Sequence, residues 1–494
     1  MVTRVTGLAS GMDIDTLVKK LMTSASAPLD RMNQKKQLLE WKRENYRELS
    51  TKLVTFTQDK IKDSLSKAST LNTQKATVTG NNTAVTATAS STASGTMTVD
   101  VKNLATSANV VSDTGLGLSA STSLATLFTV GSTIEVGGDS TIMVEAGDTI
   151  ESLVKKINNS KTAGVTAIYD ATNGLSLTAR ATGKGAGGVD SGGNLKVSDN
   201  MKAAFNLGDG TAAKNAVVEV NGLKMEQASN TFDINGVSLT LNAESAGSVS
   251  TIAITKDTDA IFSAVQSFVD SYNELLGLMN NKLSEERYSK YTPLTTAQKA
   301  EMEESDITAW TEKAKSGMLK NDSILQETVS NMRMAMVQGV TLADGSTISM
   351  TDLGITTGDY TSKGKLVLDK DKLKEALDKD PDVITNFFST NYSNSFSNNK
   401  FIETDGILAK LQKITTNTLT SLNKTAGTSL SSKELTASFI VNSSMGEQLT
   451  SLDRQISEFT SKLNRMETSY YSKFTAMETA INRYNTTASS LFSS

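Results

Sequence analysis

The feature that most constrains the fold of this chain is an apolar repeat that ends only a few residues before the C-terminus. Between residues 449 and 491 the apolar side chains are spaced by three and four residues, with one four-residue stutter after Tyr470. The positions are Leu449, Leu452, Ile456, Phe459, Leu463, Met466, Tyr470, Phe474, Met477, Ile481, Tyr484, Ala488 and Leu491. This spacing predicts a heptad helix with a narrow apolar stripe. From Gly446 to Leu491 the helix would span about 69 Å at ~1.5 Å per residue, so its stripe needs cover from this chain or another.

Two other segments have helical periodicity and could supply that cover. Residues 14–66 are predicted to be helical, with Asp13 and Asp15 as capping and dipole-complementing carboxylates at the start. A short apolar face comes first, and a longer stripe at residues 39–65 follows Pro28. A middle helix begins at Asp259. Its stripe comprises Ile261, Val265, Phe268, Tyr272, Leu275 and Met279.

The region between these helices is predicted to be mostly β. From about Ser69 small polar residues alternate with Val, Ala and Met, which is the period of a strand. Three Asn-Gly pairs, at residues 173–174, 221–222 and 235–236, each predict a hairpin with a two-residue type I′ turn. One helix interrupts the strands, and Asp148 is its predicted N-cap, with Glu151 three residues further on.

These patterns together predict an α+β fold. N-terminal, middle and C-terminal helices form a coiled-coil stalk, and a mostly β head is inserted between them. The predicted divisions are a terminal leg segment at 1–35, a stalk helix at 36–69, the β head at 70–257 with an inner subdomain at about 105–215, a helical stalk with a small β unit at 258–445, and the C-terminal coiled-coil helix and leg at 446–494.

Composition argues against an enzyme. The chain has no Cys and no His, which removes thiol nucleophiles, the commonest general base and the commonest transition-metal ligand. The Gly-rich "GKGAGG" lacks the order of a phosphate-binding loop, and "DKDKLKEALDKD" lacks the glycine and oxygen ligands of a calcium loop. We therefore predict no catalytic residues, no metal and no cofactor.

Charge and hydropathy also limit the partners. The net charge is −4, without the basic excess typical of nucleic-acid binding. No apolar run approaches the roughly 18 residues of a membrane span. The N-terminus lacks the apolar core of a cleaved secretory signal, so on this test the chain is expected to be cytosolic unless a route without cleavage exports it.

Several stretches resemble the family of bacterial flagellar filament-capping proteins, known as hook-associated protein two or FliD. The opening "GLASGMDIDTLVKKLM" carries this resemblance, as do "NGVSLTLNAESAGSVSTIAITKDTDAIFSAVQSFVDSYNELL" and "LGITTGDYTSKGKLVLDKDKLKEALDKDPDVITNFF". The stretch "AGDTIESLVKKINNSKTAGVTAIYDATNGLSLTARATGKGAG" is similar to a repeat shared by flagellins and hook-associated proteins. The matching stretches are spread over the whole chain.

The resemblance implies a cap at the growing end of the flagellar filament. It implies a homo-oligomeric ring, taken as a pentamer, that retains exported flagellin and promotes its folding and insertion. The implied partners are flagellin, the hook–filament junction proteins and a cytosolic export chaperone, and the implied route is the flagellar type III apparatus without a cleaved signal. Adhesion to host mucin or surfaces is a further role implied for such caps.

Two sets of apolar residues are predicted to carry this function. The proposed leg and subunit interface comprises Ile14, Leu17, Leu21, Met466, Tyr470, Phe474, Met477, Ile481, Tyr484 and Leu491. The proposed stalk seam comprises Leu49, Leu53, Phe56, Val265, Phe268, Tyr272, Leu452, Ile456, Phe459 and Leu463. Up to about Tyr470 we expect burial within one chain, and beyond it burial between chains.

Two alternatives remain open at this stage. One is a stalked surface adhesin, because a Ser/Thr/Asn-rich β head suits a binding surface. The other is a different flagellar axial protein, such as a hook–filament junction protein or a flagellin. The cap interpretation predicts that residues 1–30 and about 470–494 are frayed in the free monomer, since isolated helices of this length are marginal in water.

Overall fold

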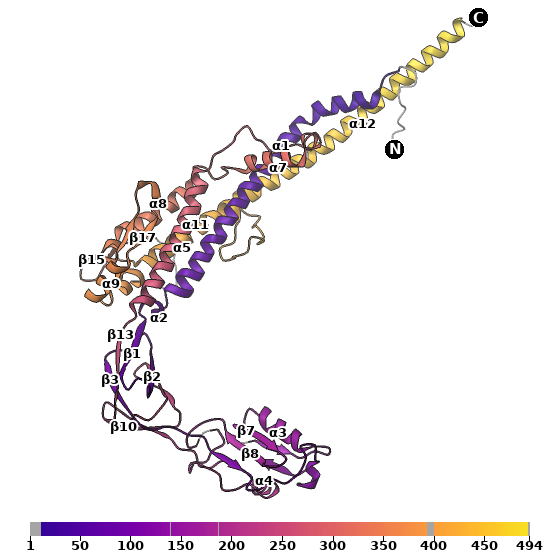
Figure 1. The fold of residues 1–494 in the computed structure, drawn as a ribbon. Coiled ribbons are helices and arrows are strands. Elements are labelled where there is room, and N and C mark those ends of the chain that lie inside the picture. Colours follow the sequence, from indigo (N-terminus) through magenta and orange to yellow (C-terminus); the bar gives the residue numbers. More distant parts are fainter. Residues whose placement is uncertain (1–10, 139, 186, 393–399, 493–494) are drawn as a thin grey trace. The chain divides into compact units, whose positions relative to one another are not determined.

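The computed structural model describes residues 11–138, 140–185, 187–392 and 400–492, and the chain divides into two compact units. The first unit contains both ends of the chain, residues 1–71 and 262–494, and the second contains residues 72–261. Each unit has its own helices and strands (Figure 1). The α+β class predicted from the sequence is confirmed.

The first unit is mainly helical. Its elements in chain order are α1 (Ile14–Thr55), the π-helix η1 (Phe56–Leu65), α2 (Ala68–Leu71), α5 (Thr258–Ser284, which begins in the second unit), α6 (Thr296–Ala300), α7 (Glu304–Lys315), α8 (Ser323–Gln338), β14 (Val340–Thr341), β15 (Thr347–Ile348), η3 (Met350–Leu353), β16 (Ile355–Thr357), η4 (Tyr360–Ser362), β17 (Leu366–Leu368), α9 (Lys370–Lys379), α10 (Val383–Ser389), α11 (Ile407–Ala426) and α12 (Ser444–Phe492). Two antiparallel strand pairs, β14 with β15 and β16 with β17, are its sheets among the described residues.

Local chemistry explains where the helices begin and end. Asp13 caps α1 by accepting a hydrogen bond from the Thr16 backbone N–H at 3.0 Å, as predicted. Asp322 caps α8, and Gly339 ends that helix at a φ of 70°. After Thr55 the α-helical ladder gives way to the π-helix η1. At its end the Ser66 N–H donates to the Ile61 carbonyl, five residues back.

Helix α11 lies at the centre of the first unit. It packs against α1, α8, α10 and α12, and most of its residues are buried, including Lys410, Thr415 and Thr418. These three buried polar side chains find partners, whereas Oε1 of the buried Gln412 has none within the described part of the chain. Lys410 Nζ donates to the Gly339 carbonyl at 2.6 Å, Thr415 bonds Thr57, and Thr418 bonds Thr328. Burial lowers the pKa of Lys410. A polar helix thus becomes a core helix because these three polar groups are paired.

The second unit is mainly β. Its elements in chain order are β1 (Gln74–Gly80), β2 (Val85–Ala89), β3 (Thr96–Asn103), β4 (Asn109–Val111), η2 (Leu124–Thr126), β5 (Thr133–Glu135), β6 (Thr141–Met143), α3 (Ile150–Asn159), β7 (Val165–Asp170), β8 (Gly174–Ala179), α4 (Asp199–Phe205), β9 (Ala216–Val220), β10 (Leu223–Gln227), β11 (Thr231–Ile234), β12 (Val237–Leu241) and β13 (Ser250–Lys256).

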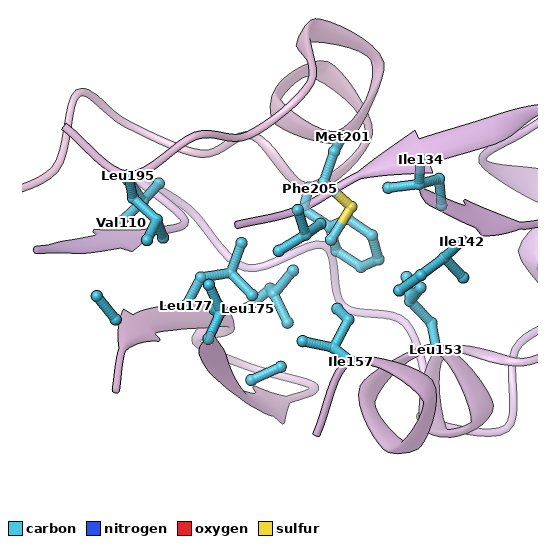
Figure 2. Packing of buried hydrophobic residues seen from close by; sticks show 14 of the residues in the cluster. Val110, Ile134, Ile142, Leu153, Ile157, Leu175, Leu177, Leu195, Met201 and Phe205 are labelled. Carbon is cyan, nitrogen blue, oxygen red and sulfur yellow. The ribbon is translucent and has the colours of Figure 1, made fainter. Parts of the chain in front are cut away.

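Two hydrophobic cores form within this unit. One lies between a five-stranded sheet in the order β1-β13-β3-β9-β10 and a three-stranded sheet in the order β11-β12-β2. The other collects the sheet β4-β8-β7, the pair β5-β6, and helices α3 and α4. In Figure 2 the side chains of Ile157 from α3 and of Met201 and Phe205 from α4 lie around Leu175 from β8, and Leu153 from α3 lies beside Ile142 from β6. The strands pair antiparallel throughout these described sheets.

Two of the three predicted Asn-Gly turns are confirmed. Asn221 and Gly222 join β9 to β10 with φ values of 51° and 80°, and Asn235 and Gly236 join β11 to β12 with 49° and 78°. Positive φ at both positions defines the type I′ turn. The two-residue turn predicted at residues 173–174 is wrong. There Asp170 pairs with Gly174, so three residues form the loop.

The predicted N-cap of α3 is also wrong by one residue. Thr149 caps the helix and forms a reciprocal capping box with Ser152. The Asp148 carboxylate instead accepts hydrogen bonds from the Glu145 N–H and the Ser152 hydroxyl and pairs with Lys156 at 2.7 Å. These hydrogen bonds and Lys156 hold the pKa of Asp148 below its usual value, against the opposing effect of burial.

Replacing the turn glycines Gly222 and Gly236 with alanine should reduce stability by different amounts. Alanine at Gly222 or Gly236 adopts a left-handed conformation, which costs about 1–2 kcal/mol. At Gly236 an added Cβ would also lie 2.6 Å from the Ser90 hydroxyl oxygen, whereas nothing lies within 4 Å at Gly222. Urea unfolding followed by circular dichroism should therefore show a greater loss of stability for Gly236→Ala. An equal or greater loss for Gly222→Ala would contradict this steric ranking.

Candidate functional site

No group of catalytic or metal-binding type stands out among the described residues. No cluster of three or more Asp or Glu residues arranged to hold a metal ion occurs in that part of the chain. None of its helices is long and apolar enough to cross a membrane. The largest functional feature predicted from the sequence, the stripe on the C-terminal helix, is the best-defined candidate.

The first half of that stripe is covered by α1. Helices α1 and α12 lie side by side and antiparallel, so that α1 numbers fall as α12 numbers rise (Figure 1). Lys36 pairs with Asp453 at 2.6 Å, and the Tyr471 hydroxyl donates to the Asp15 carboxylate at 3.0 Å. The hydrogen bond from Lys36 to Asp453 raises the pKa of Lys36. In this half Leu452 and Leu463 are buried.

The second half of the stripe, from Met466 onward, has less cover, because α1 begins at Ile14 and its residue Asp15 already bonds Tyr471. Met466, Tyr470, Phe474, Met477 and Ile481 are only half-buried. Tyr484 is 75% exposed. The side chain of the predicted leg residue Leu491 lies outside the described residues. A heptad face of this kind, with covered and uncovered halves, has apolar surface available for a further helix.

The predicted leg face of α1 is divided. Ile14 and its neighbour Val18 are buried, whereas Leu17 and Leu21 are each more than one third exposed. Buried and exposed positions alternate by three or four residues, as expected for a helix with one face packed and the adjacent face open. Leu17 and Leu21 therefore lie on an open face of α1. Together with the second half of the α12 stripe, they offer apolar surface to a helix of a neighbouring subunit. This assignment of an interface remains a proposal.

The predicted seam residues fall into separate groups. Leu49, Leu53 and Phe56 from α1 and η1 are buried, as are Val265, Phe268 and Tyr272 from α5. Phe268 packs edge-on against Phe388 of α10, with ring centroids 5.0 Å apart. Helices α5 and α1 are joined by ion pairs of Lys52 with Glu274 and Lys282 with Glu48. On α12, Ile456 and Phe459 are half-buried beside the buried Leu452 and Leu463.

Sequence reasoning missed one well-built surface feature, a long segment between α11 and α12. Residues 427–443 contain no helix or strand, yet α1 and η1 hold them firmly. Arg43 donates to the carbonyls of Ala426 and Ile440, and Ser50 donates to that of Ser429. The Phe439 ring has the Arg43 and Arg47 guanidinium groups 4.1 and 4.6 Å from its centroid. The sequence feature that could have indicated this contact is the pair of arginines four residues apart on one predicted helix.

Comparison with known proteins gives a consistent family. Residues 213–486 match the family model described as flagellar hook-associated protein 2 C-terminus, and residues 10–108 match its N-terminus. Residues 131–181 match a flagellin hook IN motif.

Individual relatives agree with the family models. Flagellar hook-associated protein 2 of Halalkalibacterium halodurans is 29% identical over 422 residues, which is 77% of this chain and 78% of that protein. The protein of the same description from Escherichia coli K12 is 27% identical over 83% of this chain and 88% of its own length. The crystal structure of D1-D2-D3 domains of the flagellar cap protein FliD from Escherichia coli is similar in fold. Its TM-score is 0.53 at 23% identity, over 77% of this chain and 96% of that one.

Proposed function

The chain belongs to the flagellar hook-associated protein 2 family, and we propose from this premise that it is a cap at the tip of the flagellar filament. In this proposal several copies form a ring, taken as a pentamer, that retains exported flagellin and promotes its insertion into the growing filament. The chain binds a cytosolic export chaperone and then leaves the cell through the flagellar type III apparatus without a cleaved signal. The hook–filament junction proteins are further partners in this proposal.

The observation that carries the proposal is the uneven cover of the α12 stripe. The helices of one chain leave the apolar heptad positions from Met466 to Ile481 only partly buried and leave Tyr484 75% exposed, although a monomeric stalk has no need of this stripe. Apolar surface removed from water contributes about 25 cal/mol per Å², so burial of these positions against a neighbour would favour assembly. We assign the second half of α12, with Leu17 and Leu21 of α1, to the leg that contacts other subunits of the filament tip.

The proposal predicts a change in hydrogen exchange on assembly. Amides of residues 470–492 should exchange rapidly in the free chain, because α1 begins at Ile14, next to the residue that bonds Tyr471, and so does not pack along most of this part of α12. The same amides should become strongly protected at assembled filament tips. Residues 449–463, which α1 covers, should be protected in both states and serve as the internal control. Equal strong protection of 470–492 in a verified monomer would mean that these positions need no neighbour.

Images of the purified chain test the ring directly. Negative-stain electron microscopy should show closed rings at micromolar concentration. Monomers at every concentration would instead favour the stalked adhesin, in which the β unit alone binds a surface. Adhesion to host mucin as an additional role of the cap is tested separately, by binding of the purified chain to immobilised mucin.

A further inference from the structure

A second apolar surface of the first unit lies on the segment between α11 and α12. We call residues 427–443 the anchored loop. Four of its large apolar side chains, those of Leu430, Leu435, Ile440 and Val441, are 48% to 65% exposed. Segments of this length without helix or strand are uncommon inside compact units, and when they are fixed in place they are usually functional.

The anchored loop is fixed at both ends and along its length. The Ile440 N–H donates to the Gly427 carbonyl at 2.8 Å, which closes the loop at its base. Lys433 pairs with Asp59 of η1, and Gln58 donates to the Ser431 carbonyl. These contacts hold the backbone while the apolar side chains face solvent. Because the loop is already ordered in the free chain, binding a partner costs little additional conformational entropy, which favours binding.

A hollow that could take an apolar side chain and a neighbouring carboxylate lies on another part of the same unit. We call it the α8 hollow. It is a cavity of about 250 Å³ lined by Tyr272, Arg333, Met336, Val337, Thr357, Gly358, Asp359, Gly364 and Leu366. At ~30 Å³ per water molecule it has room for about eight waters, which is enough for one branched apolar side chain. Val337 on its wall is 66% exposed, and Met334 beside it is 51% exposed.

Charge complementarity links the two surfaces. Arg333 on the wall of the hollow and Glu434 on the anchored loop each make no ion pair or side-chain hydrogen bond with other residues in the described part of the chain. Asp359 also lines the hollow, but its carboxylate accepts hydrogen bonds from the Thr361 hydroxyl and the Ser362 N–H. Glu434 directly precedes the exposed Leu435, so one turn of chain offers an apolar side chain and a carboxylate together.

The two surfaces cannot meet within one copy. The anchored loop is held on α1 and η1, whereas α8 packs on α11, and α11 in turn packs on α1. In Figure 1 the anchored loop is the segment whose colour lies between orange and yellow. The loop and α8 lie on opposite sides of α1 and α5. Complementary surfaces on opposite sides of one subunit form a heterologous contact, and such contacts generate rings when the rotation closes.

We propose that the anchored loop of one copy binds the α8 hollow of the next copy, with Leu435 in the hollow and Glu434 paired with Arg333. The inference rests on the proposed function, because it assigns a contact to the homo-oligomeric ring. It is one contact among several, since a stable interface buries about 800 Å² on each partner. It is distinct from the leg contact of α12.

Site-directed cross-linking tests this contact in the full-length chain. The chain has no cysteine, so each introduced thiol is unique. Val337→Cys and Thr436→Cys proteins are purified separately, mixed, and treated with a short bismaleimide. Covalent dimers are expected from the mixture and not from either protein alone. The matched control replaces Val337→Cys with Ile402→Cys, which is 56% exposed in the same unit and should give no dimer.

Charge reversal gives an independent measurement. Glu434→Arg alone or Arg333→Glu alone should raise the dissociation constant of the oligomer about tenfold, because like charges then face each other. The two changes together restore the opposite pair and should recover the original constant. Sedimentation velocity measures the constants, and circular dichroism checks folding.

The outcomes separate the two proposals. An oligomer that gives no Val337→Cys with Thr436→Cys dimer, or a double reversal no better than the worse single change, would overturn the contact while leaving the ring intact. An unmodified chain that is monomeric at every concentration would overturn both.

Discussion

Replacing both Ile481 and Tyr484 with Asp is expected to give a folded, exported chain that no longer holds flagellin at the filament tip. Both positions lie on the uncovered half of the α12 stripe, where Ile481 is half-buried and Tyr484 is exposed. Burying an unpaired carboxylate against a neighbouring helix costs several kcal/mol, which exceeds the strength of a weak leg contact. In a strain without its own cap gene, electron microscopy should show short or absent filaments, and flagellin should accumulate in the medium.

A matched pair on the same turns of α12 controls for added charge. Asn482→Asp with Asn485→Asp introduces two carboxylates at exposed positions that lie off the stripe. This variant should support filaments of normal length. Normal filaments from the Ile481 and Tyr484 variant would show that the stripe has no role in capping. Loss of surface binding only after changes in residues 72–261 would then favour the adhesin.

The α12 stripe shows which features of a helix can be predicted from a sequence pattern and which cannot. Spacings of three and four residues predict a helix and its apolar face from local geometry alone. They do not say which half of the face is covered, because this depends on the partner helix. The Lys36–Asp453 and Tyr471–Asp15 contacts set the register between α1 and α12, and each joins residues more than 400 positions apart. No local pattern contains that register.

Turns and caps were predictable where one local conformation dominates. At Asn221 and Asn235 the following glycine and the flanking strands leave a type I′ turn as the best solution. At Asn173 the same dipeptide forms part of a three-residue loop, because the Asp170 carboxylate accepts hydrogen bonds from the Thr172 and Asn173 N–H groups. A side chain four positions from the glycine thus changed the turn, which a dipeptide rule does not include.

Helix α11 and the anchored loop were beyond prediction for a different reason. The α11 sequence carries Lys410, Thr415 and Thr418, which are typical of an exposed face. They are buried because Gly339, Thr57 and Thr328 supply their hydrogen bonds from other helices. Likewise the anchored loop depends on Arg43 and Arg47, nearly 400 residues earlier in the chain. Both cases require tertiary contacts that periodicity does not encode.

Separate cores in the two units predict that one can be weakened without the other. Phe268 is fully buried in the first unit against Phe388, and Phe205 is fully buried in the second unit near Phe128 and Tyr169. Replacing a buried phenylalanine with alanine costs about 3–5 kcal/mol. That is a large part of the 5–15 kcal/mol by which proteins are typically stable. Each substitution should therefore lower the unfolding midpoint of its own unit by at least about 1 M urea.

The two tryptophans make the experiment selective. Trp41 and Trp310 both lie in the first unit, so tryptophan fluorescence reports on that unit alone. Phe268→Ala should shift the fluorescence midpoint. Phe205→Ala should leave it unchanged and shift only the part of the far-ultraviolet circular dichroism transition that comes from the second unit. If either substitution moved both transitions by the same amount, the two units would unfold as one cooperative body. A change in the β unit could then no longer be separated from a change in the leg, and variants that divide binding from capping would have to be designed on exposed residues alone.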